Sequence, residues 1–426
     1  MILRPLTLAL LAAGTLLLGG ALAGGEAADD KDVIVQKNGP ALRVYVESEN
    51  TVDVLYRSIH LPPGVGGGSN ANKFKVSNLD HVFYNGMESG RWIKGVEDRE
   101  TGNYDSAAES FAQLVETGTR EWEKVYGAIA EAECRELAGH FAEAAKAYGL
   151  VVAGYAGNPD AKPPVPPHRF WLDCKYHYGM ALAQAKSPDA SKVADELEAL
   201  GKKDNVLGAE TRGNAVRAAI AGADGNLSTF TGFMKKVLFR AQEEREVWFH
   251  FKLFCAESLR QGFKNGKEAA RTYREILTGL GNDPSRQAQV SLGLGLCLMD
   301  NDRQGALIEL LKLDALPYGS ADQKCEARFN AGRLLWDEAQ AIKGGPDFAR
   351  DERRGNFVKD TERAARLIVA AATEGPAKNP NVALAKSLLS SFGPDPDAPR
   401  LPPTGTPGAA GAPGAPTAGG APTTNR

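Results

Sequence analysis

Apolar and polar residues alternate with period two near the start of the chain. Within ALRVYVE every second position from Leu42 to Val46 is apolar, and the apolar runs DVIVQ and VDVLYRSI stand on either side of it. This alternation is typical of β-strands with one buried face, and Asn38-Gly39 indicates a tight turn between the first two strands. With KFKV and HVFYN further on, residues 24–85 are expected to hold four or five short strands. So small a unit is marginal alone, and we expect it to dock on the rest of the chain.

From residue 86 to residue 393 the apolar residues follow the period of amphipathic helices. A small residue is followed at fixed distances by Ala-x-x-x-aromatic. Gly95 precedes Ala107 and Phe111 by 12 and 16 positions, and the same pattern begins again at Ala132, 37 residues later. A repeat of this length predicts helix pairs that stack on one another. The small residues of the series are Gly95, Ala132, Gly179, Ala219, Ala256, Gly295 and Gly332.

Packing explains this spacing. A small residue on the first helix of an antiparallel pair lets the second helix approach closely, and an alanine and an aromatic residue four positions apart share one face of that second helix. One pair cannot bury its own apolar stripe, so neighbouring pairs must stack. Two segments interrupt the series. GNPDAKPPVPP is expected to form a surface insertion, because its prolines cannot continue a helix, and KGGPDFARDERRGNF is expected to be a solvated loop.

The stretches GVEDRETGNYDSAAESFAQLV, AECRELAGHFAEAAKAYGLVV, YHYGMALAQA and ARFNAGRLLWDEA resemble tetratricopeptide repeats (TPR). The resemblance covers about 300 residues and implies a mainly α protein, an α-solenoid of about seven TPR-like helix pairs, which the small β-barrel-like or SH3-like domain precedes. The period of 37 to 40 residues is longer than the family's period of about 34. The proline that often closes the second helix is generally missing. HEAT-like helix pairs are therefore an alternative.

The same resemblance implies a concave groove formed by the first helices of the pairs. Aromatic residues flanked by charge would suit a bound peptide there. The alternative is that the aromatic residues pack between neighbouring first helices. The positions that correspond to the family's groove are Trp92, Val96 and Arg99 in the first unit, Tyr126, Glu133 and Glu136 in the second, and Tyr176, Met180 and Gln184 in the third.

The two ends of the chain have compositions of their own. Residues 1–23 combine Arg4, an apolar run and the sequence Ala21-Leu22-Ala23, which is typical of a signal peptide cleaved after Ala23. An uncleaved anchor is the alternative. We therefore expect an exported protein, periplasmic, in the cell envelope or secreted, with no transmembrane segment after cleavage. Residues 394–426 are rich in Pro, Gly and Ala and are expected to be a disordered tail.

Composition and motifs give no sign of an enzyme. The net charge of −3 and the absence of a Lys/Arg block argue against nucleic-acid binding. The five cysteines are widely spaced within apolar helical stretches, so we expect buried core residues. No zinc, nucleophile-elbow or P-loop motif is present, and the six histidines are scattered without an i, i+4 pair. We therefore expect no cofactor and no metal site.

These observations favour a non-enzymatic, exported scaffold that binds a protein or peptide partner in the cell envelope. A structural alternative is a spacer or anchor that works through its β-domain and its tail. An enzyme with its site where the β-domain meets the first repeats is a third possibility. For that site the sequence offers His81, Tyr84 and Glu88.

Overall fold

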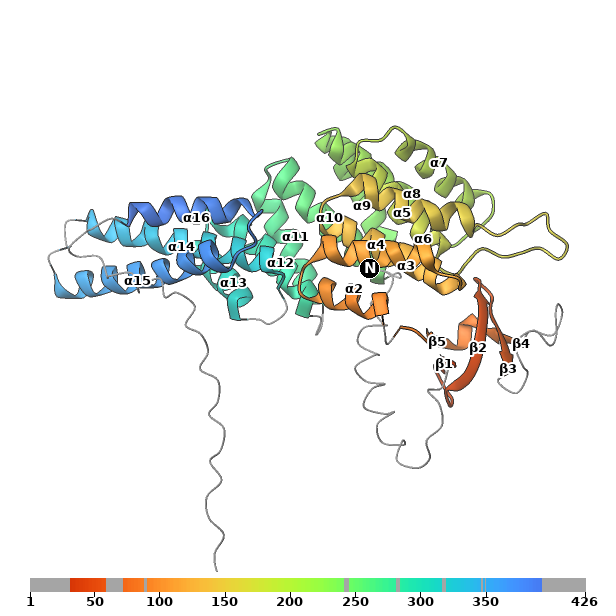
Figure 1. Ribbon diagram of the computed structural model, residues 1–426. Helices are drawn as coiled ribbons and strands as arrows, with labels where there is room; N and C mark the ends of the chain where they lie inside the picture. The colour runs from red at the N-terminus through yellow and green to blue at the C-terminus, as the bar shows by residue number, and fades with distance from the viewer. Residues whose placement is uncertain are drawn as a thin grey trace, which may run out of the picture.

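The computed structural model describes residues 31–58, 72–87, 90–240, 245–280, 284–315, 319–345, 348 and 350–392. The predicted signal peptide and the predicted tail lie outside the described residues, as does Glu88. In the described part the protein is mainly helical, with one small N-terminal sheet and fifteen α-helices. The sheet stands beside one group of helices, and the array continues away from it to α14, α15 and α16 (Figure 1).

The N-terminal sheet has five antiparallel strands. Their bounds are β1 (Asp32–Gln36), β2 (Leu42–Glu49), β3 (Asp53–Ser58), β4 (Asn72–Lys75) and β5 (Leu79–Phe83). Their order in the sheet is β4-β3-β2-β1-β5, so β4 and β5 form the two edges. Only the three-residue 3-10 helix η1 (Val76–Asn78) separates these two strands along the chain. A link this short makes the sheet curl until its edges lie near each other.

The barrel is nevertheless not closed, so the prediction of a barrel-like domain is wrong in this respect. The described strand ladders join each edge strand to one neighbour only. The edge strands have four and five residues, which leaves little backbone for a closing ladder. Lys73 and Lys75 lie on the edge strand β4, where charged side chains oppose pairing with another chain.

The sheet packs on the first helices through a shared apolar core. Ile34, Val54 and Val82 are fully buried and belong to the same cluster as Trp92 and Trp122 of the helices. The expectation that this small unit docks on the rest of the chain is therefore met within the described residues.

A buried carboxylate fixes this docking. Both Tyr84 and Tyr126 donate hydrogen bonds from their hydroxyl groups to Oε1 of Glu49, the second at 2.6 Å. The guanidinium of Arg169 forms an ion pair with the other carboxylate oxygen, and only 1% of the Glu49 side chain is exposed. The carboxylate of Glu49 on strand β2 therefore joins the sheet to helix α4 and to the chain before α6.

A second buried carboxylate, that of Asp32, also joins the sheet to the helices. Oδ2 of Asp32 accepts a hydrogen bond from the amide of Val46 at 2.8 Å and pairs with Arg120 at 2.5 Å. Its Oδ1 accepts from the amide of Asn85 at 2.9 Å. This fully buried side chain therefore joins strand β1 to the segment just before α4.

In the described residues fifteen α-helices follow one another, most with short connections and α5 and α6 with a longer one. Their bounds are α2 (Gly90–Glu100), α3 (Tyr104–Thr117), α4 (Glu121–Leu137), α5 (Phe141–Gly154), α6 (Trp171–Gln184), α7 (Asp189–Lys202), α8 (Ala209–Ala223), α9 (Leu227–Arg240), α10 (Arg245–Glu257), α11 (Gly266–Gly279), α12 (Pro284–Leu298), α13 (Arg303–Ala315), α14 (Ala321–Lys343), α15 (Asp351–Glu374) and α16 (Pro380–Ser391). A π-helical turn, η3 (Ser258–Gly262), extends α10. Each described helix packs against the next, and most neighbours lie side by side in Figure 1.

The small residues of the predicted series are all buried where helices approach closely. A Cβ atom added to Gly95 of α2 would lie 2.6 Å from Cζ of Phe111 in α3. At Gly295 it would lie 2.8 Å from Cγ of Leu310, and at Gly332 it would lie 2.6 Å from Cγ1 of Ile368. In each case the partner is on the next helix, so the absence of a side chain sets the distance between the helices.

Of the two predicted interruptions of the helical series, one agrees with the structure and the other agrees only in part. The proline-rich insertion is mostly exposed, as expected, and Thr51 of the β2–β3 turn donates its amide to the carbonyl of Pro167 at 2.9 Å. The predicted loop from 343 to 357 is wrong in its second half, because α15 begins at Asp351. Glu352 lies in the first turn of that helix, where a negative charge stabilises the positive end of the helix dipole.

All five cysteines are buried and free, as the sequence indicates. None of the helices in the described ranges is long and apolar enough to cross a membrane.

The close approach at Gly95 generates the first prediction. Gly95→Ala should destabilise the protein by about 1 to 3 kcal/mol, because the new methyl group overlaps the ring of Phe111. The matched control is Gly232→Ala in α9, where a Cβ atom meets nothing within 4 Å. That change should stabilise by about 0.5 to 1 kcal/mol, since alanine favours helix. Urea unfolding of both variants measures the difference, and equal effects would contradict this account.

The buried carboxylate generates the second prediction. Glu49→Gln should cost about 3 to 5 kcal/mol, because it leaves the buried Arg169 without its counter-charge. Glu47→Gln on the same strand is the control. Its exposed pair with Arg57 should contribute no more than about 1 kcal/mol. Denaturant titrations of the two variants should differ accordingly, and a stable Glu49→Gln protein would show that the pair does not hold the sheet.

Candidate functional site: an inner cavity

Several helices line a cavity of about 930 Å³. Its walls come from α4, the end of α6, α10, η3 and the start of α12. The α2–α3 turn, the start of α14 and residues 376–380 close it on the other side. The lining residues that matter most for its chemistry and its access are Glu133, Glu136, Gln184, Phe249, His250, Leu253, Glu257, Gln261, Arg286, Asp322 and Ala377.

The cavity exists because the beginning and the end of the helical array meet. Gly102 in the α2–α3 turn has a φ of +81°, and a Cβ atom there would lie 2.4 Å from Cβ of Ser320 at the start of α14. Ser320 caps α14 by accepting a hydrogen bond from the amide of Gln323 at 3.1 Å. The tight turn between α2 and α3 thus lies against the N-terminal cap of α14.

Five of the nine residues implied for a groove lie in the helical core. These are Trp92, Val96, Tyr126, Tyr176 and Met180, each at most 7% exposed. Trp92 packs edge to face with Phe111 and Trp122, at centroid distances of 5.3 and 6.0 Å. Their environment is that of the packing alternative, and a role in partner binding stays a prediction.

The polar residues of the set lie on the cavity or directly behind it. Glu133, Glu136 and Gln184 line the cavity. Arg99 stands behind Glu133, with its guanidinium 3.1 Å from Oε2 of that carboxylate. These four side chains therefore lie at the cavity, and their role in partner binding stays a prediction.

Three residues from three helices form a compact polar cluster in the cavity wall. Each of Glu136 (α4), His177 (α6) and His250 (α10) offers one ligand-capable atom, and these atoms all lie within 4.8 Å of one another. Nδ1 of His177 is 3.6 Å from Oε2 of Glu136, and the two imidazole centroids are 4.4 Å apart. Tyr148 donates a hydrogen bond to Oε2 of Glu136 at 3.1 Å.

Burial controls the protonation of this cluster. Loss of hydration lowers the pKa of His177 to about 3 and lowers the pKa of His250 well below its ordinary value. Both imidazoles are therefore neutral near pH 7. Burial also raises the pKa of Glu136. The hydroxyl of Tyr176 contacts Nδ1 of His250 at 2.9 Å and fixes that ring.

The sequence did not reveal this cluster, because its members come from helices far apart in the chain. One signal was available. When the register of the first three units is extended to Ala256, His250 falls on the same groove position as Tyr126. His177 has no such signal, because it does not fall on a groove position of its unit. Its ring stacks on Tyr148 at a centroid distance of 5.4 Å.

Two of the residues suggested for an enzyme at the β-domain junction, Tyr84 and His81, have different partners. The hydroxyl of Tyr84 is buried against Glu49, and burial raises the pKa of Tyr84 well above its ordinary value. His81 pairs with Asp80 on β5 at 2.8 Å. Acid, base or nucleophile groups of an active site must lie together in one pocket. The contacts of Tyr84 and His81 do not indicate such a pocket.

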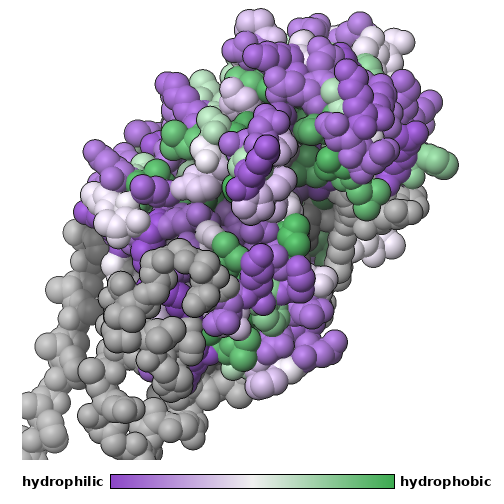
Figure 2. All heavy atoms as spheres, turned by 90° about the vertical axis from the view of Figure 1, so that its right-hand side faces the viewer, coloured by the Kyte–Doolittle hydropathy of each residue, from purple (hydrophilic) through white to green (hydrophobic). Residues whose placement is uncertain are grey.

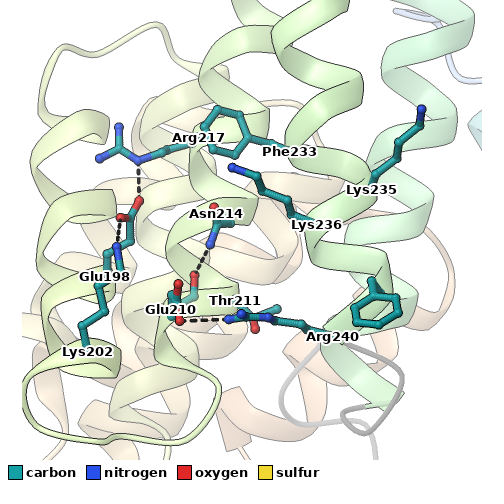
Figure 3. A pocket seen from close by; sticks show the side chains of 11 residues that line it. Glu198, Lys202, Glu210, Thr211, Asn214, Arg217, Phe233, Lys235, Lys236 and Arg240 are labelled. Atoms are coloured by element: carbon teal, nitrogen blue, oxygen red, sulfur yellow. Dashed lines mark hydrogen bonds and ion pairs between the residues drawn. The ribbon is translucent and has the colours of Figure 1, made fainter.

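A second hollow, of about 840 Å³, lies between α7, α8 and α9 (Figure 3). Figure 3 shows Glu198 between Lys202 and Arg217, and Arg240 reaching to Glu210. Its two carboxylates are thus already neutralised by neighbours. Lys235 and Lys236 also line this hollow and leave it net basic. We regard the inner cavity as the better candidate because a buried cluster of ligand-capable groups lies in its wall.

The face around the sheet gives no stronger candidate. Seen from the side of the sheet and of α7, the described surface is largely hydrophilic, and its hydrophobic residues form small separate groups (Figure 2). Scattered apolar residues of this kind are normal on a protein surface.

Comparisons with known proteins do not assign a family. No model of a known protein family matches the sequence, and a search of curated proteins returned no match.

The loop before α6 generates a prediction about pH. His168 is 4% exposed among aromatic rings, and burial lowers its pKa to about 4, below the usual 6.5. The unfolded state therefore binds more protons between these values. The stability from this residue is fully present above pH 6.5 and is lost as the pH falls toward 4.

This residue should account for about 2 kcal/mol of lost stability between pH 7 and pH 5. His168→Asn keeps an acceptor for the amide of Phe170 but cannot gain a proton. Urea unfolding at both pH values should therefore show a smaller loss in the variant than in the wild type. An identical loss would mean that His168 does not titrate as described. His140→Asn, at an exposed imidazole, is the control.

Proposed function

We propose that the protein is a TPR-like scaffold, an α-solenoid of seven helix pairs, that binds a segment of a polypeptide partner in its inner cavity. The pairs are α2/α3, α4/α5, α6/α7, α8/α9, α10/α11, α12/α13 and α14/α15, with α16 as a final cap. Export to the cell envelope, on the evidence of the N-terminal sequence, is part of the same proposal.

One observation carries this proposal. Of the helices that line the cavity, α4, α6, α10, α12 and α14 are first helices of the proposed pairs, and the starts of α3, α5 and α16 also contribute lining residues. In TPR arrays the first helices form the concave binding surface. A cavity built from the same helices in this chain is therefore in the place where such a protein would hold its partner.

The lining favours a polar segment with some basic side chains. Five acidic residues and two basic ones line the cavity. Arg99 and Arg260 stand behind two of these carboxylates, Glu133 and Glu257, so the uncompensated charge is modest. Phe249, Leu253 and Phe254 add apolar surface. Mixed aromatic, apolar and charged groups are typical of surfaces that hold an extended or helical peptide.

Crosslinking in the native cell tests the proposal. A photoreactive residue in place of Gln261, which is exposed and lines the cavity, should label a partner at one defined segment, identified by mass spectrometry. The same residue in place of Leu207, which is 86% exposed and does not line the cavity, should not label that segment.

A variant that obstructs the cavity makes the test specific. Ala377 is an exposed residue of the lining loop, so Ala377→Trp should narrow the entrance without disturbing the core. It should lower labelling from position 261 about tenfold, the effect of about 1.4 kcal/mol of lost binding. Leu207→Trp is the control and should leave labelling unchanged. Equal labelling in both variants would argue against binding in the cavity.

A further inference from the structure

The cluster formed by Glu136, His177 and His250 has unmet bonding capacity. Oε1 of Glu136 and Nδ1 of His177 are buried and have no hydrogen-bond partner among the described residues. The distance of 3.6 Å between His177 Nδ1 and Glu136 Oε2 is too long for a hydrogen bond. Buried polar atoms without partners are rare in folded proteins and are costly, so this arrangement calls for an explanation.

We propose that Glu136, His177 and His250 bind one divalent transition-metal ion, with Zn²⁺ as the best match. Two imidazoles and one carboxylate are a ligand set that Zn²⁺ takes where a fourth position remains open. Glu136 and His250 line the inner cavity, so the fourth position faces it. This inference does not depend on a polypeptide partner, because the ligands come from three helices of the chain itself.

The spacing of the ligands fits with small movements. Ligand atoms around a tetrahedral Zn²⁺ lie about 3.4 Å apart, given metal–ligand distances of about 2.0 to 2.2 Å. The His177–Glu136 distance of 3.6 Å is already close to this value. The other ligand atoms lie within 4.8 Å of one another. Side-chain rotations that move these atoms by about 1 Å would bring them to the spacing of a Zn²⁺ site.

The chemistry of the cluster favours a cation. Imidazole nitrogens and a carboxylate oxygen are electron-pair donors for a metal, and here three of them lie within 4.8 Å of one another. The carboxylate of Glu136 is buried and one of its oxygens has no hydrogen-bond partner among the described residues. A bound cation would stabilise that charge. The charged groups near His177 include Glu133, which pairs with Arg99, and Asp173, which pairs with Arg212.

Neighbouring hydroxyl groups hold the ligands in place. Tyr148 donates to Oε2 of Glu136 at 3.1 Å, and Tyr176 contacts Nδ1 of His250 at 2.9 Å. Such outer partners orient ligands and tune their affinity for a metal. The competing explanation is that the two imidazoles simply pack between Tyr148 and Tyr176 in a polar part of the core. Packing alone predicts no specific affinity for a metal.

Titration of the purified full chain, without a histidine tag, separates these explanations. Calorimetry with ZnCl₂ should show one ion bound per chain, and Co²⁺ should give the visible spectrum of a low-coordinate site. Glu136→Gln and His250→Gln should each lower the affinity at least 100-fold. Tyr176→Phe should lower it about 10-fold to 100-fold through its effect on His250. His140→Gln, at an exposed histidine outside the cluster, should bind like the wild type.

Two results would overturn the proposal. One is the absence of saturable Zn²⁺ binding to the wild type, and the other is an equal loss of affinity in His140→Gln. If a ligand variant does not fold, the Co²⁺ spectrum of the wild type decides: nitrogen ligation in a low-coordinate site supports the proposal, and the spectrum of the hydrated ion overturns it. Zn²⁺ should also raise the melting temperature of the wild type and of His140→Gln, because it binds only the folded state.

Discussion

Close approach between consecutive helices is the constraint on which this structure depends. Glycine takes the contact position on α2, α12 and α14, and the next helix fills the space with Phe111, Leu310 or Ile368. Distances between helices are set by the side chains at such contacts. The same kind of contact recurs from α2 to α14, so the chain forms a succession of closely packed helices, and the inner cavity lies among them.

Sequence pattern predicted this part of the fold well. Small residues at a repeat of 37 to 40 positions mark contacts that depend on local spacing, so they can be read without coordinates. Barrel closure depends on a ladder between edge strands, and no local pattern reports it. The residues after 350 read as a loop because they are charged, but charge alone does not prevent a helix. Asp351 and Glu352 instead lie in its first turn.

The candidate site was predictable only in part. A groove position specifies the direction in which a side chain leaves its helix, and Glu133, Glu136 and Gln184 line the cavity. It does not specify how closely the neighbouring first helices pack. Trp92, Tyr126 and Tyr176 are buried instead, Tyr126 against Tyr84 and the chain before α6. His177 and His250 meet through tertiary packing of α6 against α10, which a single sequence does not encode in any short motif.

The contact between Gly102 and Ser320 has a consequence for how such a protein can evolve. Open repeat proteins gain and lose units by duplication, since an extra unit at either end meets only solvent. Here the turn of the first pair fits against the cap of α14, with room for no side chain at residue 102. An inserted or deleted pair would move the two surfaces out of register. The number of helices between these two contact points is therefore constrained by the structure itself.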